Sequence, residues 1–119
     1  MNYRSDWRAV PGFDGYEASR TGEIRTKGGR VLAQSAHPRK SGGKSDYYVD
    51  LWQGGEHKCV RVARLVARAW VPGYADGMTV NHMDGDTLNN RIENLEWMTL
   101  ADNIRDGFRR GAYDRRKSA

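Results

Sequence analysis

The spacing of apolar residues changes near Val62, and this change limits the fold more than any other feature of the 119-residue chain. Before Val62, short apolar runs are separated by turn-forming pairs such as Thr21-Gly22 and Gly54-Gly55, which predicts short strands joined by tight turns. From 62 to 70, apolar residues recur three and four positions apart and line one face of a helix, which Pro72-Gly73 ends. The sequence therefore predicts an α+β protein that begins with an antiparallel sheet.

The two halves of the chain are expected to contain different elements. The strands predicted in the first half are 16–19, 23–25, 30–34, 47–53 and 57–62, and the predicted core residues there are Trp7, Val10, Phe13 and Tyr16. After the helix, we expect strands at 79–82 and 95–98 joined by a polar loop, then a helix that Thr99 caps and whose apolar side carries Ile104 and Phe108. We assign 1–60 to a β-rich module and 61–119 to a second module with a basic tail, with no linker long enough to make them independent domains.

The charge of the chain favours a polyanionic partner. Its 20 Lys and Arg residues exceed its 15 Asp and Glu residues, which gives a net charge of +5. Six basic residues and no acidic one lie from Arg25 to Lys44, where glycines predict hairpin tips. Basic side chains on such tips can reach phosphate groups.

Composition also excludes several classes of protein. A single cysteine, Cys59, excludes an internal disulfide framework and a zinc site with several thiolate ligands. No apolar run approaches the roughly 20 residues needed to span a bilayer, and the N-terminus does not resemble a signal peptide. We therefore expect a soluble protein of the cytoplasm that has no membrane association.

The densest group of polar side chains with chemical potential lies between Asn81 and Asn94, where seven of fourteen residues are Asn, Asp or His. A calcium-binding EF-hand loop is excluded because Leu88 stands at an alternate position after Asp84 and Asp86 where a ligand is needed. A zinc site is excluded because the three histidines lie far apart in the sequence. A polar loop that caps its own backbone remains the simplest alternative to a catalytic site.

The ordered combination of motifs resembles the HNH homing endonucleases that are common in bacteriophage genomes. The motifs that carry the resemblance are Asn81-His82-Met83-Asp84-Gly85-Asp86, Asn89-Asn90-Arg91, Asn94-Leu95-Glu96-Trp97 and Asp102-Asn103. The segment 64–72 is similar to the helix that precedes this nuclease motif, and the segments 7–13, 16–19 and 22–25 resemble the β-rich nuclease-associated module often found upstream. The resemblance covers about residues 7 to 110.

The resemblance implies a ββα-metal site, in which two antiparallel strands and a helix hold one divalent cation, Mg²⁺ or Mn²⁺. His82 matches the general base, a role that suits imidazole because its ordinary pKa lies near neutrality. Asn81 and Asn103 match the two metal ligands, and Asn94 matches the residue that holds the base in place. The residues expected to support the loop are Asp84, Asn89 and Asn90.

The resemblance also implies double-stranded DNA as the partner, nicked by a monomer or weak dimer, in the host cytoplasm if the protein is phage-encoded. The basic residues expected to bind DNA are Arg25, Lys27, Arg30, Arg39, Lys40, Lys44, Arg64, Arg68 and Arg105. Such contacts to phosphates would make the affinity fall steeply with salt.

One departure from the family pattern affects the metal site. Many HNH nucleases have Asp where this chain has Asn81, so both expected ligands here are neutral amides. Hard cations gain less from amides than from carboxylates, so we expect DNA phosphate to supply the missing charge and Mg²⁺ to bind weakly without DNA. The amides leave open an alternative, a catalytically inactive DNA-binding protein of the same fold. A more distant alternative is a basic RNA-binding or ribosome-associated protein.

Overall fold

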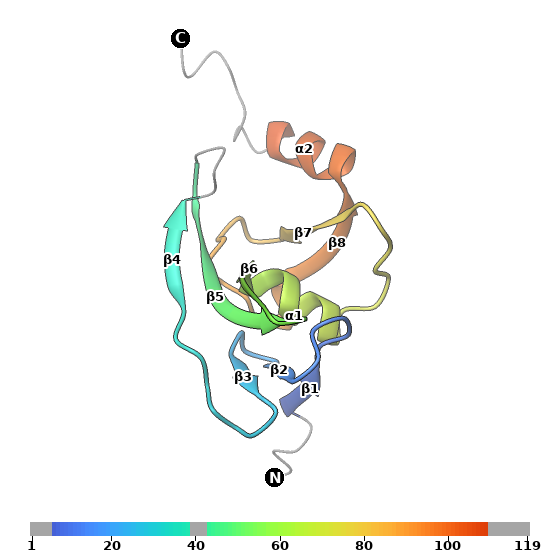
Figure 1. Ribbon diagram of the computed structural model, residues 1–119. Helices are drawn as coiled ribbons and strands as arrows, with labels where there is room; N and C mark the ends of the chain where they lie inside the picture. Colours follow the sequence, from blue (N-terminus) through green and yellow to red (C-terminus); the bar gives the residue numbers. More distant parts are fainter. Residues whose placement is uncertain (1–5, 39–42, 110–119) are drawn as a thin grey trace.

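The α+β architecture predicted from the sequence is confirmed by the computed structural model, which describes residues 6–38 and 43–109, with side chains described as far as residue 105. The elements are β1 (Trp7–Ala9), β2 (Tyr16–Ser19), β3 (Ile24–Thr26), β4 (Ser35–Pro38), β5 (Ser45–Gln53), β6 (Glu56–Arg61), α1 (Val62–Trp70), β7 (Met78–His82), the 3₁₀ turn η2 (Ile92–Asn94), β8 (Leu95–Thr99) and α2 (Leu100–Arg109). Figure 1 shows α1 in the middle of the molecule, with β1 to β3 on one side of it and β7 and β8 on the other. No helix in the described ranges is long and apolar enough to cross a bilayer.

The first sheet is an antiparallel meander in the order β1-β2-β3. The turn between β2 and β3 is organised by Ser19, whose Oγ accepts hydrogen bonds from the backbone N–H groups of Thr21, at 3.3 Å, and Glu23, at 2.9 Å. Gly22 in this turn has a φ of 96°, a left-handed conformation that glycine adopts without a steric penalty. The turn chemistry read from Thr21-Gly22 is therefore present.

The second sheet, in the order β4-β5-β6, was not anticipated as a separate sheet. A strand was predicted at 30–34, and this prediction is wrong: only an isolated bridge joins Arg25 and Val31, and the strand β4 lies further along the chain. Residues after β3 fold back on it, because Leu32 N–H donates to the carbonyl of Ile24 at 2.8 Å. The next residues are then free to pair with β5, in the register Ser35 with Tyr48.

A single hydrophobic core joins the sheets to α1. Val62, Leu65 and Val66 of α1 are fully buried, as the apolar spacing of this segment predicted. Burying a side chain such as Leu65 contributes about 1.5–3 kcal/mol. The other buried apolar residues are Val10, Ala18, Ile24, Val49, Leu51, Ala63, Ala67, Val80 and Leu95, which come from all three sheets or the segments beside them. The two modules proposed from the sequence thus share one core.

The predicted N-terminal core residues behave differently from one another. Val10 is buried, and Phe13 and Tyr16 are partly buried against the core. Trp7 is partly buried but stacks with a cation instead, because the guanidinium carbon of Arg25 lies 4.1 Å from the centroid of its ring. Trp7 therefore anchors a surface arginine.

The C-terminal part forms the ββα arrangement that the sequence predicted. β7 and β8 pair antiparallel, and α2 packs against both strands. The predicted cap is confirmed, since Thr99 Oγ1 accepts a hydrogen bond from the N–H of Asp102 at 3.1 Å. Val80 lies in the core beside α1, whereas the side chain of Thr79 contacts α2, so the two helices lie on opposite faces of the β7-β8 hairpin.

Candidate active site

His82 is the last residue of β7, and its ring is held in one orientation. The side chain is 3% exposed, and its Nε2 atom lies 2.8 Å from Oδ1 of the buried Asn90. An amide oxygen only accepts hydrogen bonds, so the Nε2 atom carries the proton in this arrangement. In the neutral ring the lone pair is then on Nδ1, which makes this atom the one that can accept a proton.

Asn90 is itself packed against the first sheet. A Cβ atom added at Gly22 would lie 3.0 Å from Cβ of Asn90, so the β2-β3 turn is in tight contact with the residue that orients His82. The loop is tied to the same turn by a hydrogen bond from the N–H of Ile92 to the carbonyl of Arg20, at 3.0 Å. The N-terminal sheet thus forms part of the support for the histidine.

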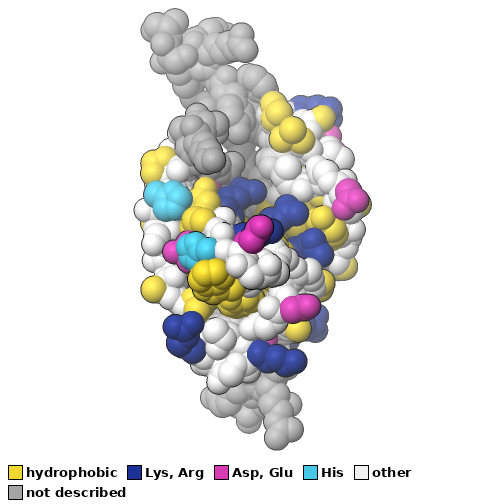
Figure 2. Space-filling model, viewed as in Figure 1, with side chains coloured by type: hydrophobic (Ala, Val, Ile, Leu, Met, Phe, Trp, Pro, Cys, Tyr) yellow, Lys and Arg dark blue, Asp and Glu magenta, His cyan; other side chains and the backbone are white. Residues whose placement is uncertain are grey.

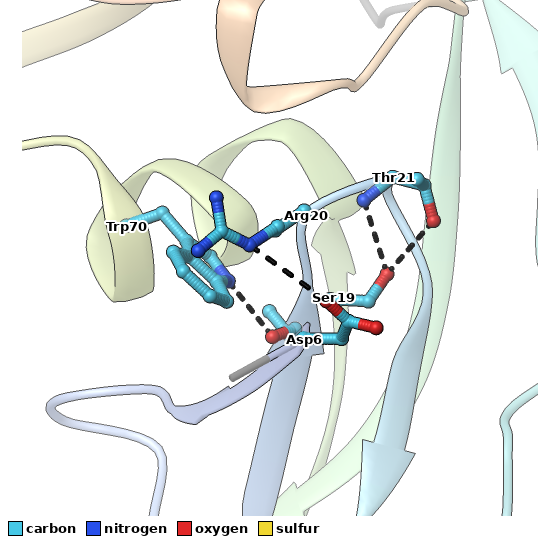
Figure 3. Close-up of polar contacts among 6 residues, drawn as sticks. Asp6, Ser19, Arg20, Thr21 and Trp70 are labelled. Atoms are coloured by element: carbon cyan, nitrogen blue, oxygen red, sulfur yellow. Dashed lines mark hydrogen bonds and ion pairs between the residues drawn. The ribbon is translucent and has the colours of Figure 1, made fainter. Parts of the chain in front are cut away.

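Trp70, the last residue of α1, contacts β2 and the turn that follows it (Figure 3). The indole Nε1–H of Trp70 donates to the carbonyl of Ala18 at 2.9 Å. Guanidinium carbons of Arg8 and Arg20 lie 4.2 Å and 4.7 Å from the centroid of the indole, within the range of cation–π attraction. Neither arginine was singled out from the sequence, because their proximity to Trp70 depends on the tertiary fold.

Asn94 closes the polar loop through its side chain. Its Nδ2 donates to Asp84 Oδ1 and to the carbonyl of Asn89, both at 2.9 Å, and its Oδ1 accepts from the N–H of Asp84 at 2.9 Å. Asn89 Nδ2 donates to the other oxygen of Asp84, at 2.9 Å. These bonds favour the ionised carboxylate, so the Asn89 amide first, then the N–H of Asp86, hold the pKa of Asp84 below its ordinary value.

The side chain hydrogen-bonded to Nε2 of His82 is Asn90, whereas Asn94 was expected to tie the loop to the strand that carries His82 and so hold the base in place. In the β7-β8 pair, His82 is opposite Leu95, so Asn94 is opposite Met83, one residue beyond the end of both strands. The carbonyl of Asn94 accepts a hydrogen bond from the N–H of Met83 at 2.8 Å. Its side chain reaches Asp84 as a result. Asn90 was expected only to support the loop, and no local sequence pattern distinguishes it from Asn89.

Asn81 and Asn103, the expected metal ligands, both have acceptors for their amide N–H groups on the hairpin. Asn81 Nδ2 donates to Glu96 Oε1 at 3.0 Å, and Asn103 Nδ2 donates to Thr79 Oγ1 at 2.6 Å. Thr79 and Asn81 are alternate residues of β7, so they share a face and are separated by about 6.6 Å along the strand. With their N–H groups engaged in this way, the two amide oxygens are the atoms left to hold a cation.

The donor set on this face fits a hard divalent cation. Amide and carboxylate oxygens are the ligands that Mg²⁺ and Mn²⁺ favour. No group of three or more His, Cys, Asp or Glu residues that could hold a metal occurs within the described ranges, so any cation here would depend on the asparagines. Glu96 was missed as a site residue, although its pairing with Asn81 follows from the antiparallel register of β7 and β8.

The basic residues expected to bind DNA lie in different environments. Arg25 is engaged within the protein, because its Nε atom lies 2.8 Å from Glu17 Oε1 and its guanidinium covers Trp7. Lys44 Nζ donates to the carbonyl of Gly85 at 2.8 Å, which brings the start of β5 against the polar loop. The use of Arg25 as a phosphate contact is thus disfavoured, because its charge is already paired.

The other basic residues that the structure describes range from partly exposed to exposed. Arg64 and Arg68 lie over the ring of Tyr74, with guanidinium carbons 5.9 Å and 3.9 Å from its centroid. Lys27 and Arg30 are exposed, and Arg105 pairs with Asp102 at 3.0 Å on the surface. Arg39 and Lys40 lie outside the described residues. Figure 2 shows Lys and Arg side chains near the middle of one face and at its lower end, with acidic side chains between them.

Comparison with known proteins places this geometry in a family. Residues 60–105 match the family model described as HNH endonuclease. DNA endonuclease I-HmuI of Bacillus phage SP01 is 34% identical over 112 residues, which cover 92% of this chain and 61% of that protein. An uncharacterised HNH endonuclease of Acanthamoeba polyphaga mimivirus is 36% identical over 106 residues, which cover 88% of this chain and 30% of that protein.

A solved structure shows the same arrangement of elements. The structure of DNA binding and cleavage by the HNH homing endonuclease I-HmuI superposes with a TM-score of 0.70 at 34% identity, over 88% of this chain and 59% of that one. The chain therefore spans about three fifths of the length of this relative, with 61% of its sequence covered. The ββα arrangement of β7, β8 and α2 lies within or beside the matched range 60–105. Residues 60–105, which contain β7, β8 and the start of α2, therefore carry the nuclease motif of the HNH endonucleases.

Proposed function

We propose that the protein is a metal-dependent DNA endonuclease that hydrolyses one phosphodiester bond at a time and so nicks duplex DNA. The observation that carries the proposal is the fixed orientation of His82, whose Nε2 atom is 2.8 Å from Asn90 Oδ1. A buried imidazole N–H needs a hydrogen-bond partner whatever its role, but this bond also fixes which ring nitrogen carries the proton, and a general base needs one ring nitrogen held protonated and the other basic. The match of residues 60–105 to the HNH endonuclease model supports the same reaction.

In the proposed reaction, Nδ1 of His82 accepts a proton from the attacking water while Asn90 keeps the ring in place. Asn81 and Asn103 hold a divalent cation, Mg²⁺ or Mn²⁺, through their amide oxygens. The cation, when bound, supplies positive charge that stabilises the charge developing on the phosphate and the leaving 3′ oxygen. The products carry 5′-phosphate and 3′-hydroxyl ends.

Double-stranded DNA is the proposed substrate, bound by basic side chains at the surface. Lys27 and Arg30, which follow β3, are exposed, and Arg64 and Arg68 on α1 are partly exposed, so these four side chains are the ones proposed to contact the phosphate backbone. A single ββα site acts on one strand, so a monomer is expected to nick. The solved structure of the relative I-HmuI, which describes DNA binding and cleavage, supports this choice of substrate.

The test is a plasmid nicking assay with Mg²⁺, Mn²⁺ or EDTA, on the wild type and on His82→Ala. We expect nicked circles with either metal, none with EDTA, and a rate for His82→Ala about 10²–10⁴-fold lower. Full activity of His82→Ala would exclude His82 as the base. DNA binding without cleavage under every metal condition would instead favour the inactive DNA-binding protein, which the neutral amides at positions 81 and 103 leave as the second candidate.

A further inference from the structure

We propose that Glu96 is a third protein residue of the cation site, which supplies the negative charge that Asn81 and Asn103 lack and fixes the orientation of the Asn81 amide. The inference rests on the proposed function, because it concerns the same cation. It also changes the expectation from sequence that the missing charge comes from DNA phosphate alone.

The register of the hairpin places Glu96 opposite Asn81. Asn81 and Glu96 are directly opposed in the β7-β8 pair, so their Cβ atoms are about 4.5–5.5 Å apart on one face. The same face carries Thr79, which contacts Asn103 of α2. Glu96 is partly buried there. The carboxylate therefore lies on the face that carries both amides.

The hydrogen bond between Asn81 and Glu96 sets the orientation of the Asn81 amide. Asn81 donates through Nδ2 to Glu96 Oε1, at 3.0 Å, which turns the amide so that its Oδ1 is the atom available to a cation. Thr79 Oγ1 does the same for Asn103. Acceptors on the β7-β8 pair thus hold the N–H groups of both amides, which leaves both amide oxygens to face a cation. An arrangement serving only to satisfy the amides would not need a carboxylate as the acceptor.

Glu96 can supply the negative charge that the two amides lack. A carboxylate has two oxygens with about four acceptor positions, so Glu96 can accept from Asn81 and still bind a cation. Affinity for a hard cation depends strongly on the number of charged ligands. No group of three or more Asp, Glu, His or Cys side chains that could hold a metal occurs in the described part of the chain, so Glu96 is the carboxylate that can compensate for the two neutral amides.

The experiment measures Mn²⁺ binding to the full chain from the loss of the free-ion signal in electron paramagnetic resonance, without DNA and with plasmid DNA in separate titrations. Glu96→Gln keeps an acceptor oxygen and removes the charge, so we expect at least about tenfold weaker binding. The matched control is Glu93→Gln, which removes the same charge from an exposed residue three positions away, and should change binding less than about twofold. Asn81→Ala reports whether the cation site itself is correctly assigned.

Each outcome decides one question. If Glu96→Gln binds Mn²⁺ as the wild type does while Asn81→Ala does not, the inference fails and the proposed function stands. If Asn81→Ala and Glu96→Gln both retain wild-type binding, the cation site of the proposed function is wrong as well. The double variant Asn81→Asp with Glu96→Gln separates charge from folding, since it restores one carboxylate to the pair. Recovery of Mn²⁺ binding supports the inference, whereas a double variant as weak as Glu96→Gln alone overturns it.

Discussion

The Nε2 atom of His82 and the Oδ1 atom of Asn90 lie 2.8 Å apart, and both side chains are buried. Behind Asn90 lies Gly22, in a turn of the N-terminal sheet about 60 positions away from His82 in the sequence. The orientation of the histidine therefore depends on three segments at once: the end of β7, the polar loop and the β2-β3 turn. The N-terminal sheet thus supports the orientation of the proposed base as well as the core.

Asn90→Asp should move the dependence of cleavage on pH. A carboxylate beside His82 favours the protonated imidazole, which cannot act as a base, so the acidic limb of the pH–rate profile should move to higher pH. The loss of rate relative to wild type should be largest near pH 6 and smallest near pH 9. Single-turnover nicking across this range measures the effect, and DNA affinity in EDTA should be unchanged. A uniform loss at every pH would show that Asn90 acts only by packing.

Gly22→Ala should disturb the site from the N-terminal sheet. The added methyl meets Asn90 at 3.0 Å, and the backbone φ of 96° is itself unfavourable for alanine, so we expect a loss of about 1–3 kcal/mol of stability and slower nicking. Gly29→Ala is the matched control, because Gly29 has a φ of 102° and nothing lies within 4 Å of the added Cβ. Thermal unfolding and nicking should both be more affected in Gly22→Ala. Equal effects in the two variants would mean that backbone strain alone is responsible.

How much of this could be read from the sequence depends on how local each signal is. The helix at 62–70 and the cap at Thr99 follow from residues within one or two turns, and both were predicted at the right place. The strand expected at 30–34 was wrong because β4 is defined by its pairing with β5, which local propensity does not specify.

In the candidate site too, some features depend on residues close in sequence and others depend on the tertiary fold. The motif around His82 is local, so the sequence alone proposes His82 as the base and Asn81 and Asn103 as the metal ligands. The partner of His82 could not be identified, since Asn89 and Asn90 are equivalent in composition and only the fold brings one of them to the ring. The contact between Glu96 and Asn81 is intermediate in predictability, because it follows from the hairpin register once the two strands are known to pair.

Arg68→Gln should weaken DNA binding in a salt-dependent way. Its guanidinium lies on the ring of Tyr74 at 3.9 Å and projects from α1, so we expect a phosphate contact whose loss reduces the slope of log K against log salt by about 0.9. Arg25→Gln is the comparison, because the charge of Arg25 is already paired with Glu17 at 2.8 Å. That variant should lose stability and keep the wild-type salt slope. Fluorescence anisotropy with a labelled duplex at several salt concentrations tests both, and a reduced slope for Arg25→Gln alone would reverse the assignment.

Asp84→Asn should change how the stability of the protein responds to acid. Hydrogen bonds from Asn89 and from the N–H of Asp86 lower the pKa of Asp84 in the folded state, so its stabilising contribution is present above the unfolded pKa, near 3.8, and is lost as the pH falls through the lower, folded value. Asparagine does not titrate, so the variant should be less stable than wild type near pH 6 and the difference should narrow below about pH 4. Thermal unfolding from about pH 2.5 to about pH 6.5, a range that spans the ordinary pKa of an Asp carboxyl, measures the difference in stability between the two proteins.

Asp76→Asn is a suitable control because Asp76 is exposed outside the polar loop, with one long contact of 3.4 Å to Tyr74. A constant difference between Asp84→Asn and wild type at all pH values would show that the carboxylate of Asp84 does not stabilise the loop through its charge.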